Sequence, residues 1–396
     1  MISEVQNRIQ RVNCRVKSEI GICLLLMTIL MLPGVSVEAG HTGRFATQCA
    51  SGPTEDRVEN LLQSMTLEEK IGQMLMIGIQ GTDVDEESLF MLHQYHIGGI
   101  ILFDRNMKTQ EQVKQLNAHL QEQAGEKLPL FIAVDEEGGV VARMKEQLPP
   151  LPSAQEIGET GYPGNARLWA GKTARALRNI GFNVNLAPVA DIGTGRGRSF
   201  GNTPAVVTEF VRSAASGYEQ EDFIYCLKHF PGLGRGKVDT HLDSTVVDAS
   251  RRELMKWDVM PFQSIIREKN PADYFIMVNH ATYSSLEKNV PASISKVVQT
   301  DFLRGKLGYQ GVIITDDIAM GALSKYYAPS DVALRAVRAG ADIILSCHVY
   351  QNGADAYHRL LRAVEKGEIS EERINASLRR ILRVKLAHLA KTAGQQ

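Results

Sequence analysis

The chain has 396 residues, of which 44% are hydrophobic and 22% are charged, and its formal net charge is −1 at pH 7. This composition predicts a soluble globular protein with either one large domain or two ordinary ones. The near-zero charge gives no support to nucleic-acid binding or to a polybasic membrane-binding surface.

The first forty residues have the layout of a secretory signal. Four basic residues at positions 8–17 precede an apolar run at 20–32, and Ala39 ends an A-x-A-like cleavage site. The apolar run is shorter than the ~20 residues that a membrane-spanning helix needs. We expect residues 1–39 to be a signal peptide, 40–54 to be a linker, and the mature protein to be exported to the periplasm or the outside. If the segment stays uncleaved, it would anchor the chain to the membrane.

The sequence holds five cysteines, two of them within the expected signal. Cys49, Cys226 and Cys347 have no CxxC spacing, so the sequence indicates neither a zinc site nor a disulfide framework. Cys226 and Cys347 sit in apolar runs, and we expect them to be buried thiols.

Beyond residue 54 the chain alternates between short apolar runs and amphipathic stretches. A capping box at residues 66–69 (TLEE) predicts the start of an early helix. The apolar runs are almost continuous in Val, Ile, Leu and Met, as is typical of parallel strands buried on both faces. The expected strands are residues 74–79, 99–103, 130–134, 183–187, 223–227, 274–278, 312–315 and 342–345. The expected helices include residues 110–123, 166–179, 206–218, 251–267, 329–338 and 371–389.

Eight successive β/α units predict an α/β fold, a single-domain (β/α)8 TIM-type barrel over residues 55–392. A doubly wound open sheet is the competing fold, and periodicity alone does not exclude it. No GxGxxG motif follows the first expected strand, which weakens a dinucleotide-binding interpretation.

Ionisable side chains follow five successive strands at the same end. Because active sites of parallel barrels lie at the carboxyl ends of the strands, this pattern indicates a functional site. The residues concerned are Asp135, Glu136, Glu137 and Arg143 after the third strand, Asp191, Arg196 and Arg198 after the fourth, Lys228 and His229 after the fifth, His280 after the sixth, and Asp316 and Asp317 after the seventh.

The fifth strand runs into a glycine-rich loop at residues 228–241. Within it, Asp239-x-His241 pairs an imidazole with a carboxylate that could orient it and raise its basicity. A solvated loop with incidental charges is the alternative interpretation of this segment taken alone.

Two chemistries could use these residues. Metal-assisted hydrolysis would take His229, His280 and Asp316 as ligands, but the first strand offers none of the ligands that such barrels usually supply there. Glycoside hydrolysis would use Asp316 or Asp317 as nucleophile and His241 as proton donor. The side chains expected to bind sugar hydroxyls are Asp135, Arg143, Arg198 and Lys228. If His241 is not the donor, Glu136 and Glu137 are the carboxylates to consider instead.

Several motifs together resemble the glycoside hydrolase family 3 β-N-acetylglucosaminidases, over roughly residues 55–390. They are GGIILF at 98–103, VDEEGG at 134–139, NLAPVAD at 185–191, KHFPG at 228–232, DTH at 239–241 and TDD at 315–317.

The resemblance implies a retaining β-N-acetylhexosaminidase that acts on carbohydrate with a single barrel domain and without metal or cofactor. We expect the protein to be a monomer. The resemblance also implies that Asp316 is the nucleophile, that His241 is the acid/base and that Asp239 is its partner. The positions that match the family's sugar contacts are Asp135, Arg143, Arg198, Lys228 and His229.

Three positions depart from the family pattern. Leu233 stands where a histidine is usual, Thr240 where a serine is commoner, and Val140 where an arginine often occurs. Three other functions stay open: a β-glucosidase of the same family, a phosphorylase that uses phosphate as acceptor, and an inactive sugar-binding barrel.

Overall fold

The computed structural model describes residues 53–125, 128–236, 240 and 243–390. The expected signal peptide and nearly all of the expected linker lie outside the described residues. The first helix, α2 (Pro53–Ser64), already begins within the last two linker positions. In the described part of the chain, no helix is both long and apolar enough to cross a membrane.

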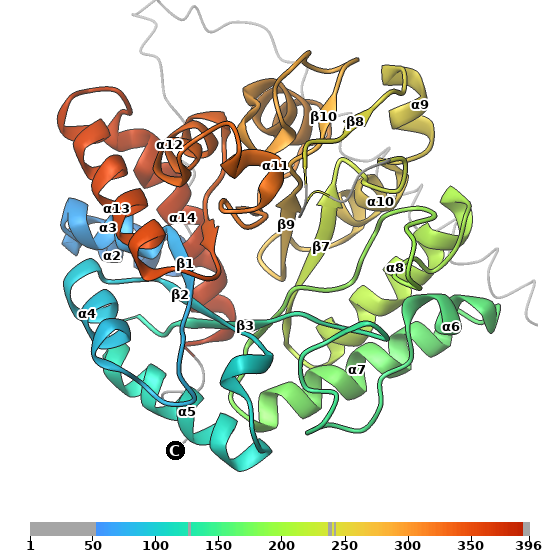
Figure 1. The fold of residues 1–396 in the computed structure, drawn as a ribbon, viewed down its shortest axis with the longest axis horizontal. Helices are drawn as coiled ribbons and strands as arrows, with labels where there is room; N and C mark the ends of the chain where they lie inside the picture. The colour runs from blue at the N-terminus through green and yellow to red at the C-terminus, as the bar shows by residue number, and fades with distance from the viewer. Residues whose placement is uncertain (1–52, 126–127, 237–239, 241–242, 391–396) are drawn as a thin grey trace, which may run out of the picture. The chain divides into compact units, whose positions relative to one another are not determined.

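Eight parallel strands form a nearly closed barrel in which neighbours follow one another in chain order (Figure 1). The strand β12 pairs with β1, where Ile344 faces Leu75. A bridge between Ile314 and Ile343 joins β11 to the segment that leads into β12. The predicted barrel is therefore confirmed, and the open sheet is wrong. The strands are β1 (Leu75–Gly78), β2 (Gly99–Leu102), β3 (Phe131–Val134), β6 (Val184–Asn185), β7 (Ile224–Phe230), β9 (Tyr274–Val278), β11 (Val312–Thr315) and β12 (Ile344–Ser346).

The amino-terminal half of the barrel interior is packed with side chains. Phe131 and Phe275 meet edge to face at 5.2 Å between ring centroids, although two strands separate β3 from β9 in the sheet. A Cβ atom on Gly99 would lie 2.9 Å from Met76 Cε and 3.2 Å from Phe131 Cβ, so a larger residue there would force the Met76 side chain to shift. Since this end is filled, a ligand must approach from the carboxyl ends of the strands.

Helices surround the strands and connect them (Figure 1). The predicted capping box is confirmed, because Thr66 Oγ1 accepts a hydrogen bond from Glu69 N and Glu69 Oε2 accepts one from Thr66 N. The helices are α2, α3 (Leu67–Gln73), α4 (Glu86–Tyr95), α5 (Gln110–Ala124), α6 (Ala154–Glu159), α7 (Gly164–Asn179), α8 (Pro204–Gln220), α9 (Arg251–Lys256), α10 (Met260–Glu268), the π-helix η3 (Val297–Lys306), α11 (Gly321–Ser324), α12 (Pro329–Ala339), α13 (Tyr350–Glu365) and α14 (Glu371–His388), with 3-10 turns at η1 (Asp104–Asn106) and η2 (Ala292–Ile294).

The single helix predicted over residues 251–267 is wrong, because two helices, α9 and α10, share this stretch. Trp257 ends α9 with φ −125° and ψ −82°, a conformation outside the helical region. Pro261 then lies in the first turn of α10, where its missing N–H leaves no helical hydrogen bond unmade.

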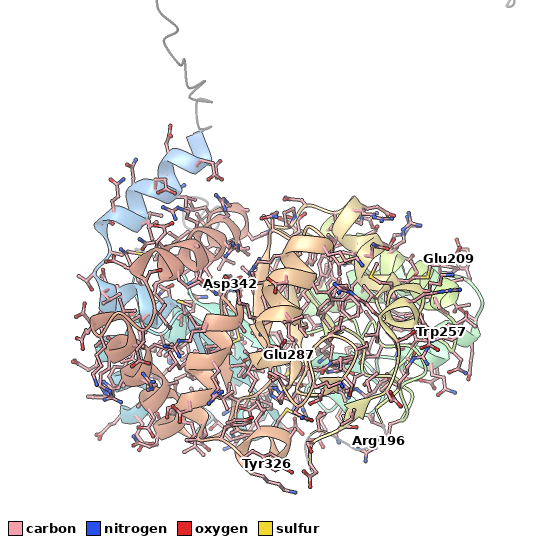
Figure 2. The ribbon with its side chains drawn as sticks, turned by 90° about the horizontal axis from the view of Figure 1, so that it is seen from above. Arg196, Glu209, Trp257, Glu287, Tyr326 and Asp342 are labelled. Atoms are coloured by element: carbon pink, nitrogen blue, oxygen red, sulfur yellow. The ribbon has the colours of Figure 1, made fainter. Side chains whose placement is uncertain are left out.

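Short strands outside the barrel follow β3, β7 and β9. The hairpin β4 (Glu136–Gly138) and β5 (Val141–Ala142) comes directly after β3. The strands β8 (Val246–Val247) and β10 (Thr282–Tyr283) pair in parallel. In Figure 2, Arg196 and Tyr326 from loops at the carboxyl ends lie at the lower edge, whereas Asp342, which precedes β12, lies farther from it.

Candidate active site

A cavity of about 850 Å³ opens at the carboxyl ends of the strands. Described residues at or just after seven strands line it, including Asp135, Arg198, Lys228, His229 and Asp316. Its volume lies within the range of about 300–1,000 Å³ that is typical of small-molecule sites. Ionisable residues from four of the five predicted strand ends therefore gather around one cavity. Glu136, Asp191 and His280 do not line it, so among the described residues the sixth strand contributes no ionisable side chain to its wall.

Glu137 joins two cations at the floor of this cavity. Lys228 Nζ lies 2.6 Å from Glu137 Oε1 and 2.6 Å from Asp135 Oδ1. Arg198 donates to both Glu137 oxygens, from Nε at 2.8 Å and from Nη2 at 2.7 Å. Burial opposes ionisation, but Lys228 and Arg198 outweigh it and lower the pKa of Glu137 to about 2. Glu137 is therefore ionised at neutral pH and holds both cations in place.

Lys228 is nearly inaccessible, with only 3% of its side chain exposed. Burial lowers the pKa of an ammonium group, but Asp135 and Glu137 more than compensate and raise that of Lys228. Asp135 is more open, with 17% of its side chain exposed. The cluster thus offers the cavity a fixed charged surface with donors and acceptors close together.

His229 connects this cluster to Asp191. His229 Nδ1 lies 2.6 Å from Asp191 Oδ2, and His229 Nε2 lies 3.4 Å from Arg198 Nη2. Arg143 lies apart from the cluster, although it lines the same cavity. Its guanidinium pairs with Asp104 at 3.5 Å and lies over the Phe103 ring.

Asp316 and Asp317 follow β11 and both line the cavity. The backbone N–H of Asp317 donates to Asp316 Oδ1 at 2.9 Å, which fixes one oxygen of the Asp316 carboxylate. Asp317 Oδ1 accepts hydrogen bonds from Ala319 N and Cys347 N. Burial, with a smaller contribution from the charge of Asp316, raises the pKa of Asp317. Backbone donors of two segments therefore hold the Asp317 carboxylate.

The expected catalytic residues Asp239 and His241 lie outside the described residues. Thr240, between them in sequence, is described and buried, and it lines the cavity. Its carbonyl oxygen accepts a hydrogen bond from Ala322 N at 3.1 Å. Ala322 belongs to α11, which directly follows the loop that carries Asp316.

The arrangement of the histidines does not suit the metal-assisted alternative. His280 Nδ1 lies 2.7 Å from Ser293 Oγ, and its Nε2 lies 2.9 Å from the Asp317 carbonyl oxygen. His229 Nδ1 is likewise held, 2.6 Å from Asp191 Oδ2. Among the described residues, no group of three or more His, Cys, Asp or Glu side chains could hold a metal ion.

Sequence reasoning missed the role of Glu137, which it considered only as a substitute proton donor. A signal was present, because side chains two residues apart in an extended chain share a face. Asp135 and Glu137 both reach Lys228, whereas Glu136 instead accepts a hydrogen bond from Met144 N at 3.0 Å. The contact that joins Glu137 to Arg198 spans 61 residues, and no local pattern indicates it.

The chain is similar to a known protein family over most of its length. Residues 66–384 match the glycosyl hydrolase family 3 N-terminal domain. A Pseudoalteromonas piscicida protein named β-hexosaminidase A is 34% identical over 77% of this chain and 56% of its own length. A Stenotrophomonas maltophilia protein named β-hexosaminidase is 34% identical over 69% of this chain and 83% of its own length.

The fold also matches solved structures. A family 3 β-N-acetylglucosaminidase from Paenibacillus superposes with a TM-score of 0.80 at 35% identity. The match covers 83% of this chain and 64% of that protein. The chain thus spans less than two thirds of the length of this enzyme and of the Pseudoalteromonas relative.

Proposed function

We propose that this chain, which belongs to glycosyl hydrolase family 3, is an exo-β-N-acetylglucosaminidase that works by a retaining mechanism. Its substrates would be oligosaccharides from cell-wall peptidoglycan or chitin that end in N-acetyl-β-D-glucosamine. The observation that carries the proposal is the ion-paired cluster of Asp135, Glu137, Arg198 and Lys228, which lines the same cavity as Asp316. The names and titles of the relatives support the same activity.

In the proposed mechanism, Asp316 attacks the anomeric carbon and forms a covalent glycosyl-enzyme. His241, with Asp239 as its partner, protonates the departing glycosidic oxygen. The same imidazole then takes a proton from water, whose oxygen attacks the anomeric carbon and releases Asp316. The N–H of Asp317, 2.9 Å from Asp316 Oδ1, keeps the carboxylate oriented throughout. No step of this mechanism uses a metal or a cofactor.

The charged cluster would bind the terminal sugar. A pyranose presents hydroxyl groups that both donate and accept hydrogen bonds. Asp135 supplies an acceptor, Lys228 and Arg198 supply donors, and His229 lies beside Arg198. Arg143, on another part of the cavity wall, would contact the sugar from the side of Phe103. Because these groups are already ordered by ion pairs, little conformational entropy is lost when the sugar binds.

We further propose that residues 55–392 form the catalytic domain and that the protein acts as an exported monomer. The signal-like segment at residues 1–39 supports export. N-terminal sequencing of the native protein should find a first residue near Gly40. An intact Met1 in the cytoplasmic fraction would contradict the export proposal.

The purified full chain should release 4-nitrophenol from its N-acetyl-β-D-glucosaminide. It should do so faster than from the β-D-glucoside, equally well in phosphate-free buffer, and without loss after treatment with a chelator. A preference for the glucoside, or a sugar 1-phosphate as product, would instead favour the other two family 3 activities. Loss of activity on chelation with recovery on added zinc would contradict the proposed mechanism.

A further inference from the structure

Asp191 is a fully buried carboxylate that follows β6 and contacts His229, which lines the cavity. Its two oxygens accept hydrogen bonds from three described groups. Oδ2 lies 2.6 Å from His229 Nδ1. Oδ1 accepts from His229 N at 3.2 Å and from Leu233 N at 2.7 Å. One side chain therefore holds the imidazole, the backbone of the same residue and the first part of the glycine-rich loop.

These contacts determine where the imidazole proton lies. A carboxylate only accepts hydrogen bonds, so the contact with Asp191 Oδ2 places a proton on His229 Nδ1. On the other side of the ring, Nε2 lies 3.4 Å from Arg198 Nη2, a group that only donates. A second proton on Nε2 would point at that N–H group. The geometry therefore favours a neutral ring whose Nε2 is a hydrogen-bond acceptor.

The backbone around Asp191 keeps this geometry fixed. The segment after β6 runs beside β7, where Ala190 N donates to the Lys228 carbonyl oxygen at 2.6 Å. Gly234 packs against the Ile192 carbonyl, whose oxygen would lie 1.8 Å from any added Cβ atom. Since only glycine permits this approach, Leu233 N stays within reach of Asp191. The carboxylate is thus anchored independently of its contact with the imidazole.

We propose that Asp191 is a positioning residue for glycoside hydrolysis at this site, an inference that rests on the proposed function. By holding the proton on Nδ1, Asp191 makes His229 Nε2 the acceptor for a sugar hydroxyl. The hydroxyl would replace the long 3.4 Å contact between Arg198 Nη2 and Nε2, donating its proton to Nε2 and accepting from the Arg198 guanidinium. With the proton on Nε2 instead, both His229 and Arg198 would present donors to the same sugar hydroxyl. The proton of that hydroxyl would then have no acceptor at this position.

The substitution Asp191→Asn tests this assignment with little change in shape. Asp191 Oδ1 accepts from two backbone N–H groups, so the amide oxygen of asparagine should take that position. The amide NH₂ then faces His229 Nδ1 and, as a donor, should drive the proton to Nε2. Nitrogen-15 spectra of the imidazoles report the tautomer directly, and a His229→Gln variant assigns the signal. We expect an Nδ1–H ring in the wild type and an Nε2–H ring in Asp191→Asn.

Asp258→Asn is the matched control. Asp258 is also a buried carboxylate beside the same loop, but its partner is Arg235, at 3.0 Å from Oδ2. This variant should keep the Nδ1–H tautomer of His229. An Nε2–H ring in the wild type, or an unchanged ring in Asp191→Asn, would overturn the assignment of the proton.

Kinetics test the link to substrate. Asp191→Asn should lower kcat/KM for the nitrophenyl N-acetylglucosaminide by roughly 10- to 100-fold, as expected for a buried hydrogen bond that is lost and leaves its partner unsatisfied. In each enzyme, the kcat/KM of the 3-, 4- and 6-deoxy substrates is compared with that of the parent substrate. For the one hydroxyl that bonds to His229, removing it should lower kcat/KM much less in Asp191→Asn than in the wild type, because the variant has already lost that hydrogen bond.

Equal losses on every deoxy substrate in both proteins, or a changed tautomer with unchanged kcat/KM, would overturn the positioning role. The spectra need no substrate, so they separate this proposal from the proposed function. A wild-type protein with the expected tautomer but no activity on any glycoside would contradict the proposed function and still support the assignment of the proton.

Discussion

Glu136 and Glu137 are consecutive carboxylates in opposite environments. Burial raises the pKa of Glu136 to about 7, whereas Lys228 and Arg198 outweigh burial and lower that of Glu137 to about 2. Because the folded-state pKa of Glu136 is raised, its contribution to the free energy of unfolding is fully present at low pH. That contribution is lost as pH rises from 4.5 to 7, where the unfolded state loses its proton first. The contribution of Glu137 to the free energy of unfolding changes with pH in the opposite direction. It is present at neutral pH and is lost as pH falls from 4.5 toward 2.

Replacing each carboxyl with its amide should therefore change the free energy of unfolding, measured with urea, in opposite directions. Glu137→Gln breaks a buried ion-pair network and should lower the unfolding free energy at pH 7 by about 3–5 kcal/mol. Glu136→Gln stays neutral and should raise it at pH 8 by up to roughly 3 kcal/mol, with little effect near pH 4.5. Changes of the same sign in both variants at pH 8 would contradict these environments.

Replacing Asp316 and replacing His241 should reduce activity in different ways as the leaving group of the substrate changes. A nucleophile is needed for every substrate, so Asp316→Ala should abolish all turnover. A general acid contributes about 10²–10⁴-fold, mainly where the leaving group needs a proton. His241→Ala should therefore impair a disaccharide far more than a dinitrophenyl glycoside in the glycosylation step. With the activated substrate, the glycosyl-enzyme should accumulate, because its release needs the same imidazole.

Pre-steady-state kinetics on both substrates, with mass spectrometry of the trapped protein, check this division. Asp239→Ala should show a weaker version of the same pattern, since it acts only through the imidazole. Equal losses on both substrates in His241→Ala, with no adduct on Asp316, would remove His241 from the acid/base role. Glu137 would not replace it, because its pKa of about 2 leaves no proton to donate at neutral pH.

The strands were predictable from sequence because each one is buried on both faces. All residues of β2, β3 and β9 are buried, for example, which produces continuous apolar runs rather than alternation. Helix boundaries were less predictable where two helices share one amphipathic stretch. In α9 and α10, the apolar pattern continues through Trp257, whose backbone dihedrals end the first helix. Pro261, in the first turn of α10, was the sequence signal of a break that the single predicted helix overlooked.

The sequence predicted those residues of the site that lie at the carboxyl ends of the strands. Barrel topology brings the carboxyl ends together, so residues such as Asp135 and Lys228 were expected to meet, and they do at 2.6 Å. The supporting contacts were not predictable, because they join segments from different loops. Asp191 reaches Leu233 across 42 residues, a contact that depends on the close approach of two backbones.

The two ends of the barrel have different chemistry. The carboxyl end holds the cavity and its paired charges, whereas α14 covers part of the opposite end. Lys385 of α14 is almost completely buried there, with its Nζ 4.8 Å from the centroid of the Phe131 ring. It donates to Gln73 Oε1 at 2.6 Å and to the Gly98 carbonyl oxygen at 3.0 Å. Both acceptors are neutral, so neither offsets the cost of burying a full positive charge.

Burial lowers the pKa of Lys385 to about 7, well below its value of about 10.4 in an unfolded chain. Between these two values the unfolded state binds more protons, so this group should make the protein more stable as pH rises. The gain from pH 7 to pH 10 should reach up to roughly 4 kcal/mol in unfolding free energy.

Urea unfolding at pH 7, 8.5 and 10 checks the effect of Lys385 on the whole barrel. Lys385→Met and Lys385→Arg should both remove the rise, since methionine carries no charge and arginine keeps its charge over this range. Lys385→Met should be the more stable of the two at pH 7, because it buries no charge, even though Gln73 and Gly98 lose their donor. If Lys385→Met and the wild type show parallel pH profiles, the amine is not titrating in this interval.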